Sequence, residues 1–135
     1  MSAELIIASL LADASIAALV GDNIALGELP QDDKTKRVKL PGLIYQIVSA
    51  TPQPNVAESS LVRTRIQINP LAMSIDELIA IHEAVKAECE FQHSQTIAGY
   101  SVVSVRRDII GKYDRDPASG AWTRPVDYIL LHYEL

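Results

Sequence analysis

Nine residues near the middle of the chain alternate between two kinds of side chain. Over residues 61–69 one set of positions is mostly apolar, and the other set is strongly polar: Val62, Thr64, Ile66 and Ile68 against Arg63, Arg65, Gln67 and Asn69. A period of two places successive side chains on opposite faces of an extended strand. The alternation therefore predicts a β-strand with one buried face and one polar face, which excludes an all-helical fold.

The rest of the pattern places helices and further strands around this one. Residues 3–20 are rich in Ala and Leu and predict a helix that ends at Gly21. Ser74 and Glu77 form a capping box, which predicts a second helix running to about Glu90. Runs rich in Val, Ile and Leu predict three more strands, at residues 43–50, 101–110 and 126–135.

This order of elements, α-β-β-α-β-β, predicts an α+β fold. We expect a mostly antiparallel sheet of about four strands with two main helices packed on one face. With 135 residues the chain fits a single domain, residues 1–135. We expect no membrane span, because no apolar run approaches the roughly 20 residues that a bilayer requires.

Charge and cysteine content exclude further classes of protein. The chain has 12 Lys and Arg residues and 17 Asp and Glu residues, for a formal net charge of −5. This excess of negative charge disfavours a dedicated nucleic-acid binder. The single cysteine, Cys89, cannot form an intramolecular disulfide. A lone cysteine is typical of proteins that fold in a reducing compartment. Glu4 agrees with this, because a secretory signal would carry basic residues at that position.

The chain carries no complete catalytic or metal-binding motif. His82-Glu83 begins like a zinc-protease helix, but Lys86 stands where the second histidine ligand belongs. We therefore predict no metal site, no cofactor and no catalytic residue. A rival hypothesis is a small cytoplasmic α+β enzyme or ligand-binding domain that uses His82, Cys89 or His93, and it requires a concave pocket where these side chains converge.

Three groups of polar residues are candidates for contacts with partner proteins or with other copies of the chain. The first is the polar face of the alternating strand, with Arg63, Arg65 and Gln67, to which a second arginine pair at 106–107 adds charge. The second is a basic cluster in a proline-bounded segment, and the third is a polar turn; these contribute Lys34, Lys36, Arg37, Asp114 and Asp116. A face or loop of this composition suits a protein partner better than a small molecule.

Several segments, taken in order, resemble a known protein family. They are the helix ending in Ala18-Leu-Val-Gly-Asp22, the segment Leu40-Pro-Gly-Leu-Ile-Tyr-Gln-Ile-Val-Ser49, Arg65-Ile-Gln-Ile-Asn69, Asp116-Pro-Ala-Ser-Gly-Ala-Trp122 with Arg124, and Asp127-Tyr-Ile-Leu-Leu-His-Tyr133. In this order the chain resembles the bacteriophage tail completion proteins, the head–tail joining or tail terminator family of siphophage-type tails and related prophages.

The resemblance implies a structural protein of the virion without a chemical step. It implies a homo-oligomeric ring, commonly of six subunits, at the head-proximal end of the tail after assembly in the host cytoplasm. The implied partners are the tail tube protein and the head connector or stopper protein, and DNA would pass through the lumen without specific binding. An adaptor of a contractile or secretion-like apparatus would look similar in sequence and remains a further alternative.

Overall fold

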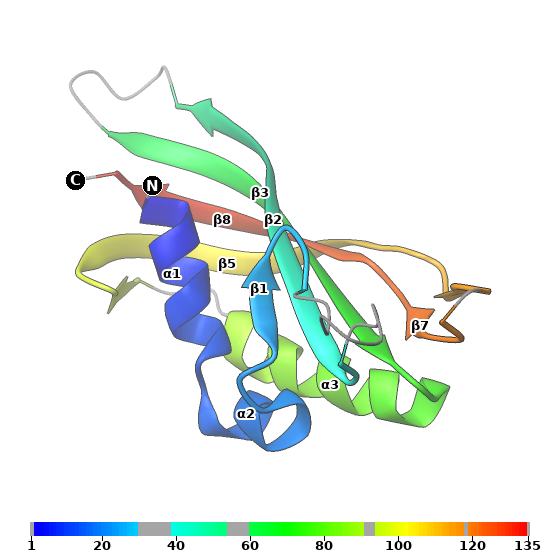
Figure 1. The fold of residues 1–135 in the computed structure, drawn as a ribbon. Coiled ribbons are helices and arrows are strands. Elements are labelled where there is room, and N and C mark those ends of the chain that lie inside the picture. The colour runs from blue at the N-terminus through cyan, green and yellow to red at the C-terminus, as the bar shows by residue number, and fades with distance from the viewer. Residues whose placement is uncertain (1, 30–38, 54–59, 91–93, 118, 135) are drawn as a thin grey trace.

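The computed structural model describes residues 2–29, 39–53, 60–90, 94–117 and 119–134. Their elements run in the order α1 (Ser2–Leu11), α2 (Ala14–Val20), β1 (Ile24–Leu26), β2 (Gly42–Pro52), β3 (Leu61–Ala72), α3 (Ile75–Cys89), β4 (Gln95–Ile97), β5 (Tyr100–Ile110), β6 (Asp114–Arg115), β7 (Trp122–Thr123) and β8 (Val126–Tyr133). The fold is mixed α+β, as the sequence predicts, with three helices and one curled sheet in the described part of the chain (Figure 1).

The alternating segment becomes β3, the strand around which the sheet is organised. The sheet order is β1-β2-β3-β8-β5-β4, and β3 pairs antiparallel with both β2 and β8. Every second residue of β3 is buried from Val62 to Ala72. The predicted period of two is thus confirmed along the full length of the strand.

The sheet differs in detail from the four antiparallel strands expected. Eight strands are present among the described residues, and β1 pairs with β2 in parallel, matching Ile24 to Leu43. The segment between β5 and β8, which contains the predicted polar turn, includes the short antiparallel pair β6–β7. β2 lies second from one edge of the sheet, where the three residues of β1 flank it.

The single N-terminal helix expected over residues 3–20 is divided into α1 and α2. The two helices bend by 76° at their junction. Asp13 causes the break because it acts as the N-cap of α2: its carboxylate accepts a hydrogen bond from the Ser15 backbone N–H at 2.9 Å. Gly21 ends α2 with φ of 65°, a backbone conformation that glycine adopts without strain.

The capping box predicted at Ser74 is present. The Ser74 side chain accepts a hydrogen bond from the backbone N–H of Glu77 at 3.2 Å. From there α3 lies across the sheet and contacts β3, β5, α1 and α2. It buries Leu78, Ile81, Val85 and Cys89. Ile79, by contrast, points away from the core and is 42% exposed.

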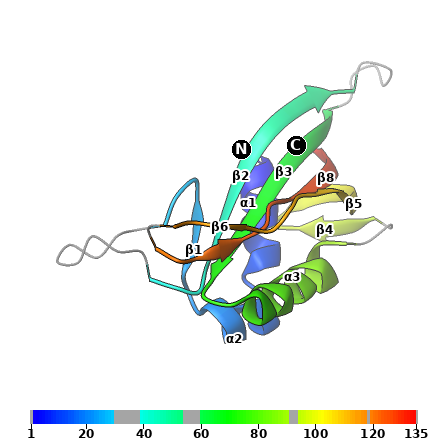
Figure 2. The same ribbon diagram turned by 90° about the vertical axis from the view of Figure 1, so that its right-hand side faces the viewer.

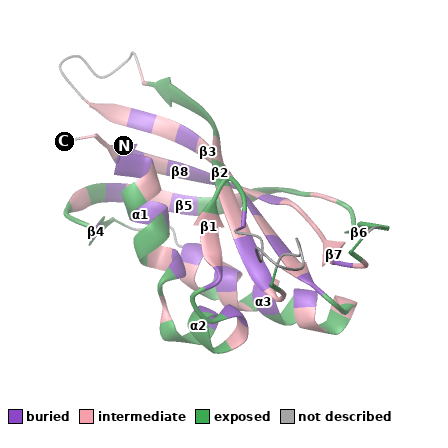
Figure 3. Ribbon diagram, in the orientation of Figure 1, coloured by how far each residue is buried: buried purple, intermediate pink, exposed green. Residues whose placement is uncertain are grey.

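All three helices help to enclose one hydrophobic core. Buried side chains from α1, α2 and α3 and from β3, β5 and β8 form one cluster, which includes Ile7, Ile16, Ile66 and Leu130. Figure 3 shows the buried residues concentrated where the helices meet the sheet. Viewed from the side in Figure 2, β2 and β3 extend together beyond this covered region.

A chain of polar side chains crosses the core beside α1. His132, fully buried, is 2.8 Å from the Thr64 hydroxyl through Nε2 and 3.1 Å from the Ser2 hydroxyl through Nδ1. The Ser2 hydroxyl donates its one proton to Glu134 Oε1 at 2.6 Å, so toward His132 the same oxygen accepts a hydrogen bond from Nδ1–H. Nε2 of this tautomer carries no proton, and it accepts from the Thr64 hydroxyl. Burial lowers the pKa of His132. The imidazole is thus held neutral with both nitrogens satisfied.

No single helix in the described part of the chain has the length and apolar character to cross a bilayer. α1 and α2, which are bent relative to one another, reach the necessary length and apolar composition only when the two helices are counted together.

Candidate interaction surface

The polar side chains of β3 form an uncovered face of the sheet, opposite the helices. Arg63, Arg65, Gln67 and Asn69 alternate with the buried residues of β3, and all four are half-buried. Strand pairing adds the facing side chains of the neighbouring strands, among them Gln46, Arg106, Asp108 and Asp127. We call this surface the open sheet face.

Arg65 is the centre of an ion-pair network on the open sheet face. Its guanidinium lies 2.7 Å from Asp108 Oδ2 and 3.1 Å from Asp127 Oδ2, so it joins β3 to both β5 and β8. Arg106 lies 3.6 Å from the other oxygen of Asp108. The hydrogen bond from Arg65 lowers the pKa of Asp108, and the hydrogen bonds from the Asp108 and Asp127 carboxylates raise the pKa of Arg65.

Amide side chains extend the network toward β2. Gln67 donates to Asp127 Oδ1 at 3.5 Å and accepts at Oε1 from Gln46 at 3.1 Å. Asn69, further along β3, accepts a hydrogen bond from the Thr123 hydroxyl of β7. The open sheet face therefore has a fixed pattern of donors and acceptors that spans β2, β3, β8 and β5.

The two predicted arginines of β3 have different surroundings. The Arg65 guanidinium is paired with carboxylates of neighbouring strands. Arg63 lies opposite Thr51 and Leu131 in the sheet. Its charge adds to the effect of Arg65 in lowering the pKa of Asp108. Arg106 is the more exposed cation of this face, with 51% of its side chain accessible. A partner would meet Arg106 before it met Arg65.

The predicted polar turn is the tip of the β6–β7 pair. The Asp114 carboxylate accepts a hydrogen bond from the Arg115 backbone N–H at 2.9 Å, and Asp116 Oδ2 accepts from the Ser119 hydroxyl at 2.7 Å. Arg115 also lies over the Trp122 ring, 5.7 Å from its centroid. Asp114 and Asp116 are exposed, and these two hydrogen bonds shape the turn itself.

The basic cluster Lys34, Lys36 and Arg37 lies outside the described residues, as does His93. The prediction of a partner contact at this cluster stays a prediction. No group of three His, Cys, Asp or Glu side chains that could hold a metal ion occurs among the residues that the structure describes.

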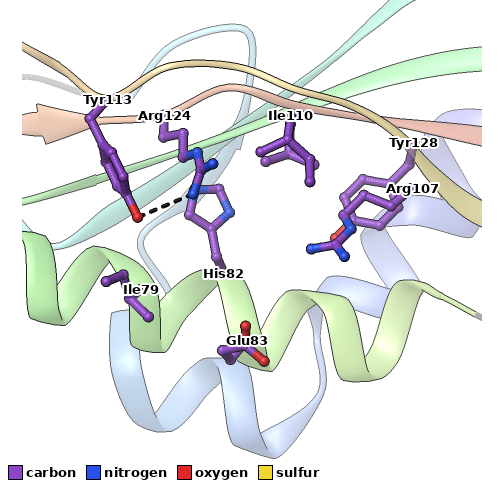
Figure 4. Close-up of a pocket in the computed structure, with 9 residues that line it drawn as sticks. Ile79, His82, Glu83, Arg107, Ile110, Tyr113, Arg124 and Tyr128 are labelled. Carbon is purple, nitrogen blue, oxygen red and sulfur yellow. Dashed lines mark hydrogen bonds between the residues drawn. The ribbon is translucent and has the colours of Figure 1, made fainter.

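The structure does not bring Cys89 together with His82. Cys89 is fully buried on α3, and burial raises the pKa of its thiol to about 12, so the thiol is protonated and inert at neutral pH. His82, two turns earlier, lies in the wall of a cavity between α3 and the sheet (Figure 4). Cys89 and His82 therefore do not form a catalytic pair, and the part of the enzyme hypothesis that involves His93 lies outside the described residues.

The sequence reasoning missed residues whose roles depend on strand pairing. The acids that hold Arg65 come from β5 and β8, 43 and 62 residues further along the chain. The arginines beside His82, Arg107 and Arg124, likewise come from distant segments. The only local signal was the presence of charged residues in otherwise apolar strands.

No protein-family model matches the sequence, and no curated protein matches it. Solved structures do resemble it. A chain described as the virion of a native gene transfer agent particle aligns over 97% of this chain and 96% of its own length, with a TM-score of 0.69 and 14% identity. A second solved chain aligns over 100% of this chain and 99% of its own, with a TM-score of 0.61 and 14% identity. The fold is thus shared from end to end with these two chains.

Proposed function

We propose that this chain is a structural protein of a phage-like virion, and more narrowly a tail terminator or tail completion protein. In this role copies of the chain form a ring, of six subunits in the family it resembles, that caps the tail tube and binds the head connector or stopper protein. The ring performs no chemical step and needs no cofactor. Its place is the head-proximal end of the tail.

The observation that carries the proposal is the end-to-end overlay with a chain of a gene transfer agent virion. An overlay that covers nearly all of both chains compares a whole structural unit, rather than a common supersecondary motif. Fold alone does not assign function. The sequence resemblance to tail completion proteins, which rests on different observations, points in the same direction.

The open sheet face supplies a surface that suits assembly. A ring built by rotation uses a heterologous interface, in which each subunit offers two different patches. One patch is the open sheet face, where the network around Arg65 fixes the side chains before binding and so reduces the entropy lost on association. The projecting part of β2, where Val48 is 52% exposed, supplies an apolar second patch.

The acidic side of α3 suits a lumen through which DNA passes. Asp76 and Glu83 are exposed on this helix and Glu90 is exposed at its C-cap, and Lys86 is the one lysine of the helix. A negatively charged wall repels phosphates and keeps DNA from adhering. We therefore place α3 toward the ring axis; a ring with α3 on its outer rim would contradict this orientation.

Light scattering after size-exclusion chromatography, followed by electron microscopy, tests self-association. We expect a discrete ring, formed either in solution or on tail tubes of the same particle, and we expect added protein to stop tube growth. Arg106→Glu reverses the most exposed charge of the open sheet face and should weaken ring formation. Lys112→Glu, which reverses an exposed charge outside the candidate contact surfaces, is the matched control. A monomer at all concentrations that neither binds tubes nor alters their length would refute the proposal.

A further inference from the structure

A cavity on the helix side of the sheet carries an arrangement that the assembly role does not use. It has a volume of about 260 Å³ and lies between α3 and the strands β5 and β8. Figure 4 shows His82 and Arg124 pointing toward one another across it, with the Arg107 guanidinium further along α3. Two arginines and a histidine thus share one hollow in a chain whose net charge is −5.

His82 has an unsatisfied polar atom in this cavity. Its Nε2 is buried and has no hydrogen-bond partner. The imidazole ring donates a hydrogen bond to the backbone of Arg124. Because Nε2 is unpaired, we assign this bond to Nδ1–H. Buried polar atoms normally have partners, so an orphaned one calls for an explanation. A ligand group placed between His82 and the arginines would supply it.

Arg124 is held in position to receive such a group. Its Nε donates to the Gly111 carbonyl at 2.8 Å, and its Nη1 donates to the Tyr113 hydroxyl at 3.1 Å. The guanidinium also lies 4.5 Å from the centroid of the Tyr113 ring. These contacts orient the planar group but do not neutralise its charge. Arg107 is the second cation, and its ion pair with Glu90 is long, at 3.9 Å.

We propose that this cavity is a binding site for an aliphatic carboxylate, with Arg124 and Arg107 holding the carboxylate oxygens and His82 Nε2 donating to one of them. Arginine is the side chain best suited to a carboxylate, because its planar donors match the two oxygens. The apolar walls, which include Ile79, Ile110 and Val126, suit the methylene groups of such a ligand. Size and chemistry thus fit the side chain of Glu or a small dicarboxylic acid.

The surroundings of the cavity favour a carboxylate over a phosphate or a nucleic acid. Glu83 lies in the cavity wall, and the exposed residues of α3 beside it are predominantly acidic. A polyanion would be repelled by these charges over its whole length. A small carboxylic acid with an apolar stem carries at most two charges, so it meets less repulsion than a polyanion and gains both the cations and the apolar walls.

Binding should be coupled to uptake of one proton by His82. In the neutral ring Nε2 carries no proton and cannot donate to a carboxylate, so the complex forms when the imidazole takes a proton from solvent. The charged groups that face His82 are Arg107, Arg124 and Glu83, and Tyr113 and Tyr128 complete the titratable groups of the cavity. The bound carboxylate opposes the two arginines and stabilises the imidazolium. Affinity should therefore rise at least about threefold from about pH 7.5 to about pH 5.5.

A titration followed by NMR tests the site, with glutarate as the probe and glutaramide, its neutral counterpart, as the control ligand. We expect the His82 imidazole and arginine Nε signals to shift with a Kd on the order of 1 mM. Arg107→Gln should weaken binding about tenfold. Its matched control is Arg106→Gln, because the neighbouring side chain on β5 lies on the opposite face of the sheet.

Further variants keep the outcome decisive. Arg124→Gln should likewise weaken binding about tenfold or more, and Glu83→Gln should strengthen it about twofold because a competing negative charge is removed. Unchanged spectra at roughly 50 mM glutarate, tens of times the expected Kd, would overturn the proposal. Equal shifts with glutaramide, or tighter binding of inorganic phosphate, would overturn it as well.

Light scattering with and without glutarate then identifies the source of the carboxylate. If an acidic side chain of a second copy fills the cavity, glutarate should shift oligomers toward monomers. If oligomers persist while glutarate binds, the natural occupant is a small molecule. Both results uphold the carboxylate site, and neither depends on the virion role proposed above.

Discussion

Replacing Thr64 by valine should test how the buried polar chain is held. The Thr64 hydroxyl donates to His132 Nε2 at 2.8 Å, and both residues are fully buried. Valine keeps the shape of threonine, so no cavity is created. The change leaves an imidazole nitrogen without a donor in a place that water does not reach.

The expected cost follows from that orphaned acceptor. An unsatisfied buried acceptor costs about 1–3 kcal/mol, more than the hydrogen bond itself contributes. For a domain of this length such a loss lowers the melting temperature by about 4–11 °C. His132→Leu in the same chain removes the acceptor, so the double variant should lose less stability than the two single variants added together.

Urea unfolding followed by circular dichroism measures this effect. Thr51→Val is the control, because Thr51 lies on the exposed end of β2 and its replacement should change the free energy of unfolding by less than about 0.5 kcal/mol. If Thr64→Val were as stable as the wild type, the neutral, doubly hydrogen-bonded His132 would be the wrong description of the core.

Three other substitutions or conditions give equally direct tests. Burial lowers the pKa of His82 from 6.5 to about 4, so between these pH values the unfolded state binds more protons than the folded state. The free energy of unfolding should therefore fall by about 1–2 kcal/mol on acidification from about pH 6.5 to about pH 4, after allowance for partial exposure. Urea unfolding at several pH values measures this dependence, and His82→Gln should flatten it. Gly42→Ala should lower the melting temperature, because a Cβ there would lie 2.7 Å from Asn23 Nδ2 and overlap the Leu29 side chain; calorimetry measures it, and an unchanged melting temperature would show that these neighbours move aside. Cys89, buried with its pKa raised to about 12, should react with iodoacetamide only as fast as the protein opens, and rapid labelling of the native protein would contradict its position in the core.

Local patterns predicted those elements that local interactions determine. The alternation over residues 61–69 and the capping box at Ser74 correspond to β3 and α3 because each depends on neighbours within a few residues. The break between α1 and α2 also had a local signal, since Asp13 followed by Ser15 is a capping sequence. The alanines and leucines on both sides of Asp13 have high helix propensity, so the segment was predicted as one continuous helix.

Features set by long-range pairing could not be predicted in this way. The parallel pairing of β1 with β2, and the β6–β7 pair, involve segments of two or three residues with little periodicity. The same limit applies to the candidate sites. Arg63 and Arg65 have equivalent positions in the alternation, but only the register of β3 with β8 brings Asp127 within 3.1 Å of Arg65.

The two proposals concern opposite faces of one sheet and can therefore fail separately. Arg106 and Arg107 are adjacent on β5: Arg106 pairs across the open sheet face with Asp108, and Arg107 lies in the wall of the cavity beside His82. A strand presents neighbouring side chains to opposite sides, so each substitution leaves the other surface intact. Loss of ring formation in Arg106→Glu with normal glutarate binding would separate assembly from ligand binding. If glutarate instead dissolves the ring, and Arg107→Gln both weakens glutarate binding and weakens the ring, then the cavity itself holds the neighbouring subunit, and both faces of the sheet take part in assembly.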